Sequence, residues 1–288
     1  MSKLTSTFQK IVNNVNLLIE DPVTFTRKIK YLYGTAQSEN IKIGKDINFY
    51  IDLNLEHPAI RGMYFGIYEV NLIDALKKFL KHGDTFIDVG ANIGYISGHA
   101  LSFVGKSGSI HAFEPVPKYF NYLTKFRDIN ANYSITLNNL ALGSATTFAK
   151  IAINETNFGW NTMVPDFMSN GVKEEIEVQT ILLDDYVLSL DKIERENISV
   201  IKIDVEGYEF EVLKGGYKFL KDATKPPIII VEINTSAYPK LGYTAKDISD
   251  FMSSLNYSCK SLNLQRNIDL SKLTKTTDVC FVPQNTKY

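Results

Sequence analysis

Cysteine is scarce in this chain of 288 residues, which holds only Cys259 and Cys280. Two cysteines make neither a disulfide framework nor a zinc site, so we expect free thiols in a reducing compartment. Both fall in late strand candidates that can be neighbours. No apolar run approaches the ~20 residues of a membrane span, and the first residues lack the pattern of a secretory signal. We therefore expect a soluble cytoplasmic protein.

Charge of one sign is also missing, because 31 basic residues balance 32 acidic ones and the net charge is −1. This balance gives no general attraction to nucleic acid or to an anionic membrane. An apolar fraction of 44% is ordinary for a globular protein and allows a substantial core. The sequence shows no internal repeat and no flexible linker between two cores.

Two phosphate-binding motifs are absent: G-x-G-x-x-G of dinucleotide sites and G-x-x-x-x-G-K-[ST] of phosphate loops. Instead, Asp84–Tyr95 combines a short apolar run with glycines at 90 and 94, spaced G-x-x-x-G. Apolar residues then recur at helical spacing. This pattern predicts a strand, a tight turn and a helix, an arrangement whose backbone N–H groups can hold a nucleotide.

Two acidic residues narrow the choice of nucleotide. Asp88, just before the first glycine, would repel a pyrophosphate but suits the sulfonium and amino group of S-adenosylmethionine. Other Rossmann-like ligands stay open on this pattern alone. Glu114 lies 20 residues beyond Gly94 at a strand end, where an acid can accept hydrogen bonds from both ribose hydroxyls. Since NAD enzymes use the same spacing, Glu114 indicates an adenosine ligand without choosing the cofactor.

Strands and helices alternate along most of the chain. The expected strands, besides the first, are Ser109–Phe113, Ile135–Leu142, Ser199–Val205, Ile228–Ile233, Tyr257–Leu262 and Asp278–Val282. The expected helices are Tyr68–Lys81, Pro117–Asn130, Tyr208–Leu220 and Thr244–Leu255. Residues 146–182 form a β-rich insertion, with strand-like runs at 147–153 and 175–182. The loop between these runs holds Trp160, which is either a substrate wall or a core residue.

The N-terminal residues 1–55 are predicted to form a helical and hairpin cap. Residues 4–19 place their apolar residues on one helical face, and Phe25–Tyr33 is a second helix candidate. Residues 41–53 alternate as a hairpin with its turn near residues 44–46. A homodimer contact through the first helix and a membrane-surface anchor are the alternatives, and lysines are too sparse on its polar face to favour the anchor.

Lys202 and Asp204 alternate with apolar residues, so their side chains share one face of a strand. Burying both is costly unless they are paired or functional. They are a Lys–Asp pair inside the fold, or they are exposed at the strand end, or they belong to a site, since ligands of open α/β sheets bind at the carboxyl ends of strands. Asp184 and Asp185 open a helix, which is more typical of capping than of a sugar-nucleotide site.

In this order the motifs resemble those of the FkbM family of S-adenosylmethionine-dependent methyltransferases. The matching stretches are Phe86–Gly94, Ala112–Pro115, Ala141–Gly143, Leu183–Tyr186 and Ile201–Glu209, with Gly66–Glu69 upstream. The resemblance covers about residues 60–265. It implies an α/β, Rossmann-like class I methyltransferase fold over residues 56–288, with a seven-stranded, mostly parallel sheet whose last strand is antiparallel, behind the N-terminal extension.

The resemblance also implies a cofactor, a reaction and site residues. S-adenosyl-L-methionine would be converted to S-adenosyl-L-homocysteine by O-methylation of a hydroxyl on a sugar, glycan or natural product. Carried over by position, the residues at the methionine end of the cofactor are Asp88, Gly90, Asn92 and Gly94. Glu114 would take the ribose, Asn139 and Ala141 would lie near the adenine, and Glu69 would close over the cofactor. Asp204 and Glu206 would face the reacting centre as catalytic residues.

Two mechanisms and two other functions stay open. Asp204 or Glu206 can take the proton of the hydroxyl as a general base. Alternatively, Asp204 and Glu232 can bind a divalent cation that lowers the pKa of the hydroxyl, although no dedicated metal motif is present. The chain can also be a non-catalytic module that binds S-adenosylmethionine, or an NAD-dependent oxidoreductase, which the glycine spacing disfavours. A nucleic-acid partner is not expected, since a basic stripe is missing.

Overall fold

The computed structural model describes residues 21–36, 39–53, 57–154, 159–167 and 172–284. The chain divides into two compact units, one of residues 1–41 and 50–70 and the other of residues 42–49 and 71–288. The predicted division into residues 1–55 and 56–288 stays a prediction. The helix predicted over residues 4–19 lies outside the described residues.

Within its described residues, the first unit contains two short helices. Helix α2 (Pro22–Tyr33) begins at Asp21, whose carboxylate accepts a hydrogen bond from Thr24 N at 3.0 Å. Helix α3 (Pro58–Phe65), which the sequence analysis missed, ends at Gly66 in a left-handed conformation. Arg61 joins the two helices, because it donates hydrogen bonds to the carbonyls of Tyr31 at 2.6 Å and Gly34 at 2.8 Å.

The second unit is built on a seven-stranded sheet of order β11-β12-β10-β9-β3-β4-β5. Its strands are β3 (Thr85–Val89), β4 (Ser109–Phe113), β5 (Ser134–Asn138), β9 (Ile198–Ile203), β10 (Ile228–Ile233), β11 (Tyr257–Lys260) and β12 (Thr277–Pro283). Neighbouring strands from β10 to β5 are parallel, whereas β12 is antiparallel to β10 and β11. The predicted mostly parallel sheet with an antiparallel last strand is confirmed.

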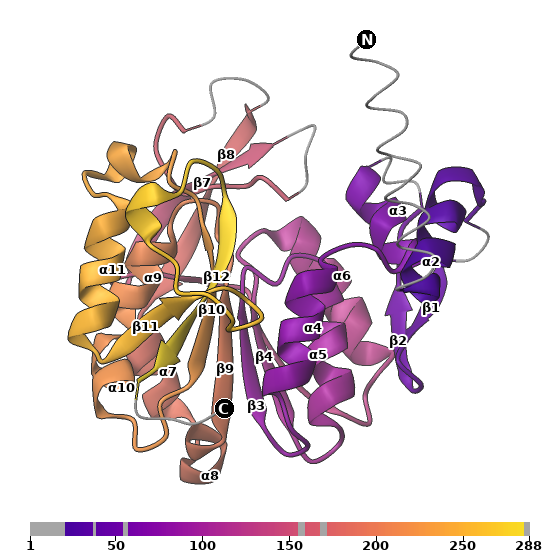
Figure 1. Cartoon of the computed structure of the whole chain (residues 1–288), viewed down its shortest axis with the longest axis horizontal. Helices are drawn as coiled ribbons and strands as arrows, with labels where there is room; N and C mark the ends of the chain where they lie inside the picture. Colours follow the sequence, from indigo (N-terminus) through magenta and orange to yellow (C-terminus); the bar gives the residue numbers. More distant parts are fainter. Residues whose placement is uncertain (1–20, 37–38, 54–56, 155–158, 168–171, 285–288) are drawn as a thin grey trace. The chain divides into compact units, whose positions relative to one another are not determined.

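Helices cover both faces of this sheet (Figure 1). One group comprises α4 (Val70–Phe79), α5 (Tyr95–Val104) and α6 (Pro117–Asp128). The other comprises α7 (Leu183–Ser189), α9 (Glu209–Gly215), α10 (Tyr217–Asp222) and α11 (Ala245–Ser254). Short helices also occur at α8 (Lys192–Glu196), η1 (Tyr238–Leu241) and η2 (Leu270–Lys272). Strands β3 and β4 are buried at every residue, as expected for parallel strands covered on both faces.

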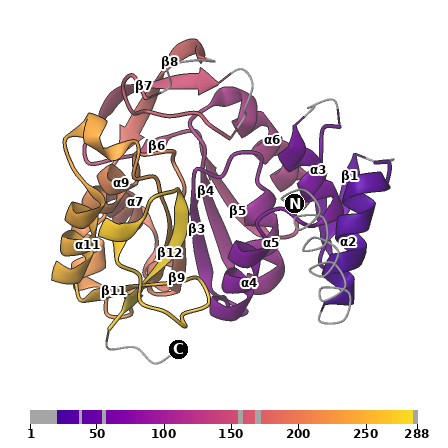
Figure 2. The same cartoon turned by 45° about the horizontal axis from the view of Figure 1, so that its top comes forward.

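A hairpin and a second sheet complete the structure. Strands β1 (Asn40–Ile43) and β2 (Ile47–Tyr50) form the hairpin predicted over residues 41–53. Strands β7 (Thr147–Asn154) and β8 (Val172–Ile181) are the two strand-like runs predicted in the insertion, and with β6 (Ala141–Leu142) they form a separate three-stranded sheet (Figure 2). Trp160, between β7 and β8, is 57% exposed, so it is not a core residue.

Two predicted elements are each divided in the structure. The strand expected at Ile135–Leu142 ends at Asn138, and Ala141–Leu142 joins the other sheet. The side chain of Asn139 donates hydrogen bonds to the carbonyls of Glu114 and Pro115 where the chain leaves the first sheet. The helix expected at Tyr208–Leu220 breaks at Gly216, where a Cβ atom would lie 2.8 Å from Leu183 Cδ2.

The two cysteines are unpaired, and the described helices do not span a membrane. Cys259 and Cys280 lie on the neighbouring strands β11 and β12, and both are free thiols, as predicted. Burial raises the pKa of each thiol to about 12, so both stay protonated at neutral pH. Among the described residues, every helix is too short or too polar to cross a bilayer.

Candidate active site

The turn after β3 is held between the ends of two neighbouring strands. Gly90, Asn92 and Gly94 have φ angles of 78°, 51° and 88°. The N–H groups of Gly90 and Ala91 donate to Phe113 O, at the end of β4. On the other side, a Cβ atom on Gly90 would lie 1.9 Å from Asp204 O, so only glycine lets β3 and β9 end this close together.

Glu114 supports the same turn from the end of β4. It is 5% exposed, and its Oε2 and Oε1 accept hydrogen bonds from Asn92 N and Val116 N, both at 2.9 Å. Burial raises the pKa of Glu114 to about 7, although the two backbone hydrogen bonds oppose this shift. Asn139 donates to Glu114 O at 2.8 Å, and the buried Ala141 follows it. The predicted contacts of Glu114 with ribose, and of Asn139 and Ala141 with adenine, stay predictions.

Lys202 is the central cation of the site, and the Lys–Asp pair considered from sequence is present. The lysine is 4% exposed, and its Nζ lies 3.3 Å from both Asp88 Oδ1 and Asp204 Oδ2. It also donates to Gly90 O at 2.8 Å. Burial alone would lower the pKa of Lys202, but the charges of Asp204 and Asp88 outweigh burial and raise it above its ordinary value. The ammonium group therefore stays charged.

Asp88 has a different environment from the one expected of a direct cofactor ligand. Its side chain is fully buried, and its Oδ2 accepts a hydrogen bond from Ser97 Oγ at 2.6 Å while Oδ1 faces Lys202. Asp88 thus ties the end of β3 to α5 and β9. Its predicted contact with the methionine end of the cofactor stays a prediction.

Three acids converge at the carboxyl ends of β9 and β10. Asp204, Glu206 and Glu232 each bring one oxygen within 4.8 Å of the other two. Burial, followed by the charge of Asp204, raises the pKa of Glu206 to about 8 and that of Glu232 to about 10. Carboxylates this close repel one another, which favours the protonated forms of Glu206 and Glu232 even with the cation of Lys202 beside the cluster. Protons or a bound cation would relieve this repulsion.

The donor set of this cluster fits a divalent cation of the magnesium type, because such ions prefer carboxylate and amide oxygens. Glu232 Oε2 is buried and has no hydrogen-bond partner among the described residues. The side chain of Asp204 is 38% exposed, which leaves the cluster open on one side. The structure thus brings together Asp204 and Glu232, the pair predicted from sequence as possible metal ligands, and adds Glu206.

A loop of the insertion reaches the same place. Thr162 Oγ1 donates to the carbonyl of Glu206 at 2.6 Å, and Thr162 also pairs with Ala152 of β7. The side chain of Asn161 accepts a hydrogen bond from Asn154 N and also bonds Tyr119, on α6. Trp160 precedes these two anchored residues and is exposed. The loop is therefore fixed beside Glu206, with its indole accessible.

Glu69 is the last residue that the resemblance assigned to the cofactor. Glu69 lies in the first unit with a φ angle of 52°, and its predicted closure over the cofactor stays a prediction.

Sequence reasoning missed His111 of β4, whose Nδ1 lies 2.6 Å from Tyr186 Oη and whose Nε2 lies 2.9 Å from Glu194 Oε1. Burial lowers the pKa of His111. Its partners are at least 75 residues away, so no local pattern marks them.

Comparisons with known proteins give a matching family model and a similar relative. The model of the methyltransferase FkbM domain matches residues 88–259. The hexuronic acid methyltransferase AglP of Haloferax volcanii is 30% identical over 203 residues, which are 70% of this chain and 74% of that protein.

Two solved structures are similar at low identity. A putative rRNA methylase from Clostridium thermocellum is 14% identical, with a TM-score of 0.43. The match covers 73% of this chain and 92% of the methylase chain. An S-adenosylmethionine-dependent O-methyltransferase from Thermotoga maritima is 11% identical, with a TM-score of 0.41. The match covers 77% of this chain and 68% of that O-methyltransferase chain. Neither likeness bears on the substrate.

Proposed function

Because the chain belongs to the FkbM family of methyltransferases, we propose that it transfers a methyl group from S-adenosylmethionine to a hydroxyl of a sugar, glycan or natural product. The observation that supports this most is the meeting of the glycine turn, Glu114 and the acid cluster at the carboxyl ends of neighbouring parallel strands. Ligands of open α/β sheets bind at such ends. The substrate in the name of the relative favours a sugar acid as acceptor.

In this proposal the turn from Gly90 to Gly94 holds the methionine end of the cofactor. The backbone can approach the ligand closely there, and α5 begins directly after Gly94, so the positive end of its helix dipole lies beside the turn. Asp88 contributes mainly through Lys202, which fixes the carbonyl of Gly90. Glu114 accepts hydrogen bonds from the ribose hydroxyls, and these bonds would favour the ionised form of its carboxyl group.

Asp204 is the proposed general base. Lys202 Nζ lies 3.3 Å from the Asp204 carboxylate, and the 38% exposure of the Asp204 side chain gives an acceptor access to it. As the acceptor oxygen bonds to the methyl carbon, the carbon–sulfur bond breaks, sulfur keeps the electron pair, and Asp204 takes the hydroxyl proton. The exposed indole of Trp160 offers a face on which a sugar ring can pack beside Glu206.

A divalent cation is a second proposal for the same residues. Asp204, Glu206 and Glu232 would hold it, and its charge would lower the pKa of the acceptor hydroxyl. The raised pKa values of Glu206 and Glu232 support this proposal, because bound cation would replace the protons that the two acids otherwise carry.

The test compares Asp204→Asn with the wild-type protein. We expect loss of methyl transfer to hexuronic acid glycosides by about 100-fold or more, with affinity for S-adenosylhomocysteine within a few fold. The measurements are transfer of a labelled methyl group and calorimetric titration with S-adenosylhomocysteine. Asp185→Asn, an exposed acid on α7, is the control.

Each outcome separates the alternatives. Near-normal turnover of Asp204→Asn would contradict its role as base. Binding of S-adenosylhomocysteine without transfer to any acceptor tested would favour a non-catalytic module, and stabilisation by NAD instead would favour an oxidoreductase. If turnover is lost in EDTA and restored by magnesium, the proposed divalent cation is supported. Unchanged turnover in EDTA would contradict it.

A further inference from the structure

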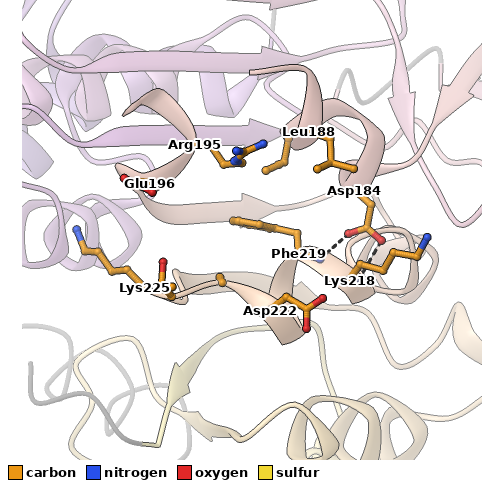
Figure 3. A pocket seen from close by; sticks show the side chains of 11 residues that line it. Asp184, Leu188, Arg195, Glu196, Lys218, Phe219, Asp222 and Lys225 are labelled. Carbon is orange, nitrogen blue, oxygen red and sulfur yellow. Dashed lines mark hydrogen bonds between the residues drawn. The ribbon is translucent and has the colours of Figure 1, made fainter. Parts of the chain in front are cut away.

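A cavity of about 340 Å³ lies between α7, α8 and α10 (Figure 3). Helix α8 leads into the start of β9 at Ile198, and the loop after α10 leads into the start of β10 at Ile228. The acid cluster lies beyond the other end of β9, which a strand of six residues places about 17–20 Å away. The cavity is therefore separate from the candidate active site. Its volume is within the range of small-molecule sites.

The floor and one wall of the cavity are apolar. Val187 and Leu188 of α7, Phe219 of α10 and Ala223 supply this surface. The side chain of Phe219 extends across the middle of the cavity, with Leu188 and Arg195 on one side of it and Asp222 on the other (Figure 3). Leu188 is 66% exposed. A flat or branched apolar group would cover Leu188 and Phe219 by entering here.

The acids around the cavity are largely engaged elsewhere. Asp184 is buried, and its two oxygens accept hydrogen bonds from Lys218 N at 3.0 Å and Phe219 N at 2.8 Å. Glu196 lies 3.8 Å from Lys192 Nζ, on the same helix. Of the three lining acids, only Asp222 has no ionic or hydrogen-bond partner within the described ranges of the chain.

The cations around the cavity are freer. The guanidinium group of Arg195 and the ammonium group of Lys218 have no hydrogen-bond or ion-pair partner in the described part of the structure. Lys225 Nζ donates to a hydroxyl, Ser199 Oγ at 3.2 Å, and has no acidic partner among the residues that the structure describes. Arg195 is half-buried beside Phe219 and Leu188, where an anion would be partly shielded from water. Charge-assisted hydrogen bonds to a guanidinium are strongest in such places.

We propose that this cavity binds a small amphipathic anion, in which a carboxylate or sulfonate contacts Arg195 and an aromatic or branched apolar body packs on Phe219 and Leu188. The inference stands on the shape and charge of the cavity and does not depend on methyl transfer. It adds a second small-molecule site at the amino ends of β9 and β10.

The probe is 8-anilinonaphthalene-1-sulfonate, an aromatic sulfonate whose fluorescence rises in apolar surroundings. The full-length protein is titrated with and without saturating S-adenosylhomocysteine. We expect saturable binding at one site that S-adenosylhomocysteine does not displace. N-phenyl-1-naphthylamine, which has the same rings without the sulfonate, should bind about tenfold more weakly or worse.

Two variants locate the probe. Arg195→Gln removes the cation, and Leu188→Asp places an acid at an exposed position of the apolar wall, so each should weaken probe binding by about tenfold or more. Lys221→Gln, on α10 but outside the lining, should bind as the wild-type protein does. A cooperative thermal transition near that of the wild type shows that each variant is folded.

Three results would overturn the proposal. One is binding by folded Arg195→Gln and Leu188→Asp that equals wild-type binding. Another is displacement of the probe by S-adenosylhomocysteine, which would place it in the cofactor crevice. The third is equal affinity for the uncharged amine, which would remove the need for an anion. A protein that fails to bind S-adenosylhomocysteine would contradict the proposed function and leave this test intact.

Discussion

Lys202 is a buried cation whose contacts join the ends of β3 and β9. Replacing it by methionine would keep most of the volume but leave Asp88 buried without its counter-charge. Removing one partner of a buried ion pair typically costs about 3–5 kcal/mol. We therefore expect Lys202→Met to lower the free energy of unfolding by about that amount, measured by urea denaturation.

Two further variants serve as controls for Lys202. Adding Asp88→Asn to Lys202→Met removes the unpaired charge and should recover part of the loss. Lys225→Met, at an exposed lysine, should change the free energy of unfolding by less than about 0.5 kcal/mol. Wild-type stability of Lys202→Met would show that the buried pair contributes nothing.

The carboxyl groups of Glu206 and Glu232 give the protein a predictable pH dependence. Their pKa values are raised in the folded state, to about 8 and about 10, from 4.5, so the folded protein binds more protons than the unfolded chain between these values. We therefore expect these two groups to lower the free energy of unfolding as pH rises from about 5 towards 10. Glu232→Gln should flatten this fall.

Thermal melting in EDTA between pH 5 and pH 10 measures the effect. Glu175→Gln, at an acid whose side chain is 54% exposed, should leave the pH dependence unchanged. A Glu232→Gln protein that loses as much stability as the wild type over this range would show that Glu232 is not the titrating group. If magnesium binds the cluster, its addition should stabilise the wild type more at pH 9 than at pH 6.

The residue contacts show where sequence reasoning reached its limit. The alternation of Lys202 and Asp204 with apolar residues predicted one shared face, and the pair alternative is confirmed. The second partner of Lys202, Asp88, was not predicted, because the parallel register places Asp88 directly beside Lys202 from 114 residues away. Such a pairing depends on strand order, which the residues around each position do not contain.

Among the elements, the glycine turn after β3 tolerates little change at Gly90. Gly90 and Gly242 both have φ near 80°, but a Cβ would lie 1.9 Å from Asp204 O at Gly90 and meets nothing within 4 Å at Gly242. Gly242→Ala should therefore cost only the backbone strain, about 1–2 kcal/mol. Gly90→Ala should in addition displace the end of β9 and abolish binding of S-adenosylhomocysteine.

Calorimetric titration and urea denaturation of the two alanine variants measure this difference. Gly242→Ala is the matched control, since it has the same φ requirement without the steric contact. Binding of S-adenosylhomocysteine by Gly90→Ala with wild-type affinity would show that the close approach of β3 and β9 is not needed for the site.

Element positions followed from sequence where local signals determine them. The apolar runs and their flanking glycines and prolines predicted β4 and β10 to the residue. The breaks at Asn139 and Gly216 were missed, and at both positions the chain meets a distant residue: Asn139 donates to Glu114 O, and Gly216 lies close to Leu183. These partners lie 25 and 33 residues away in the chain. Tertiary contacts of this kind override local periodicity.

For the whole molecule, the hairpin residues 42–49 belong to the same compact unit as the seven-stranded sheet. Phe49 is fully buried, with its ring centroid 5.6 Å from Tyr95 and 6.0 Å from Phe126. Asn48 and Asn130 exchange hydrogen bonds at 2.9 and 2.7 Å. These contacts cover α5 and α6, the helices that follow the glycine turn and Glu114.

If the hairpin is part of this core, Phe49→Ala should lower the free energy of unfolding by about 3–5 kcal/mol, because it leaves a cavity against α5 and α6. Phe148→Ala, at a ring that is 65% exposed, should cost less than about 0.5 kcal/mol. Urea denaturation monitored by circular dichroism compares the two. If Phe49→Ala and Phe148→Ala have equal free energies of unfolding, the hairpin does not stabilise the methyltransferase core. A single unfolding transition that only Phe49→Ala shifts would show that the hairpin is part of that core.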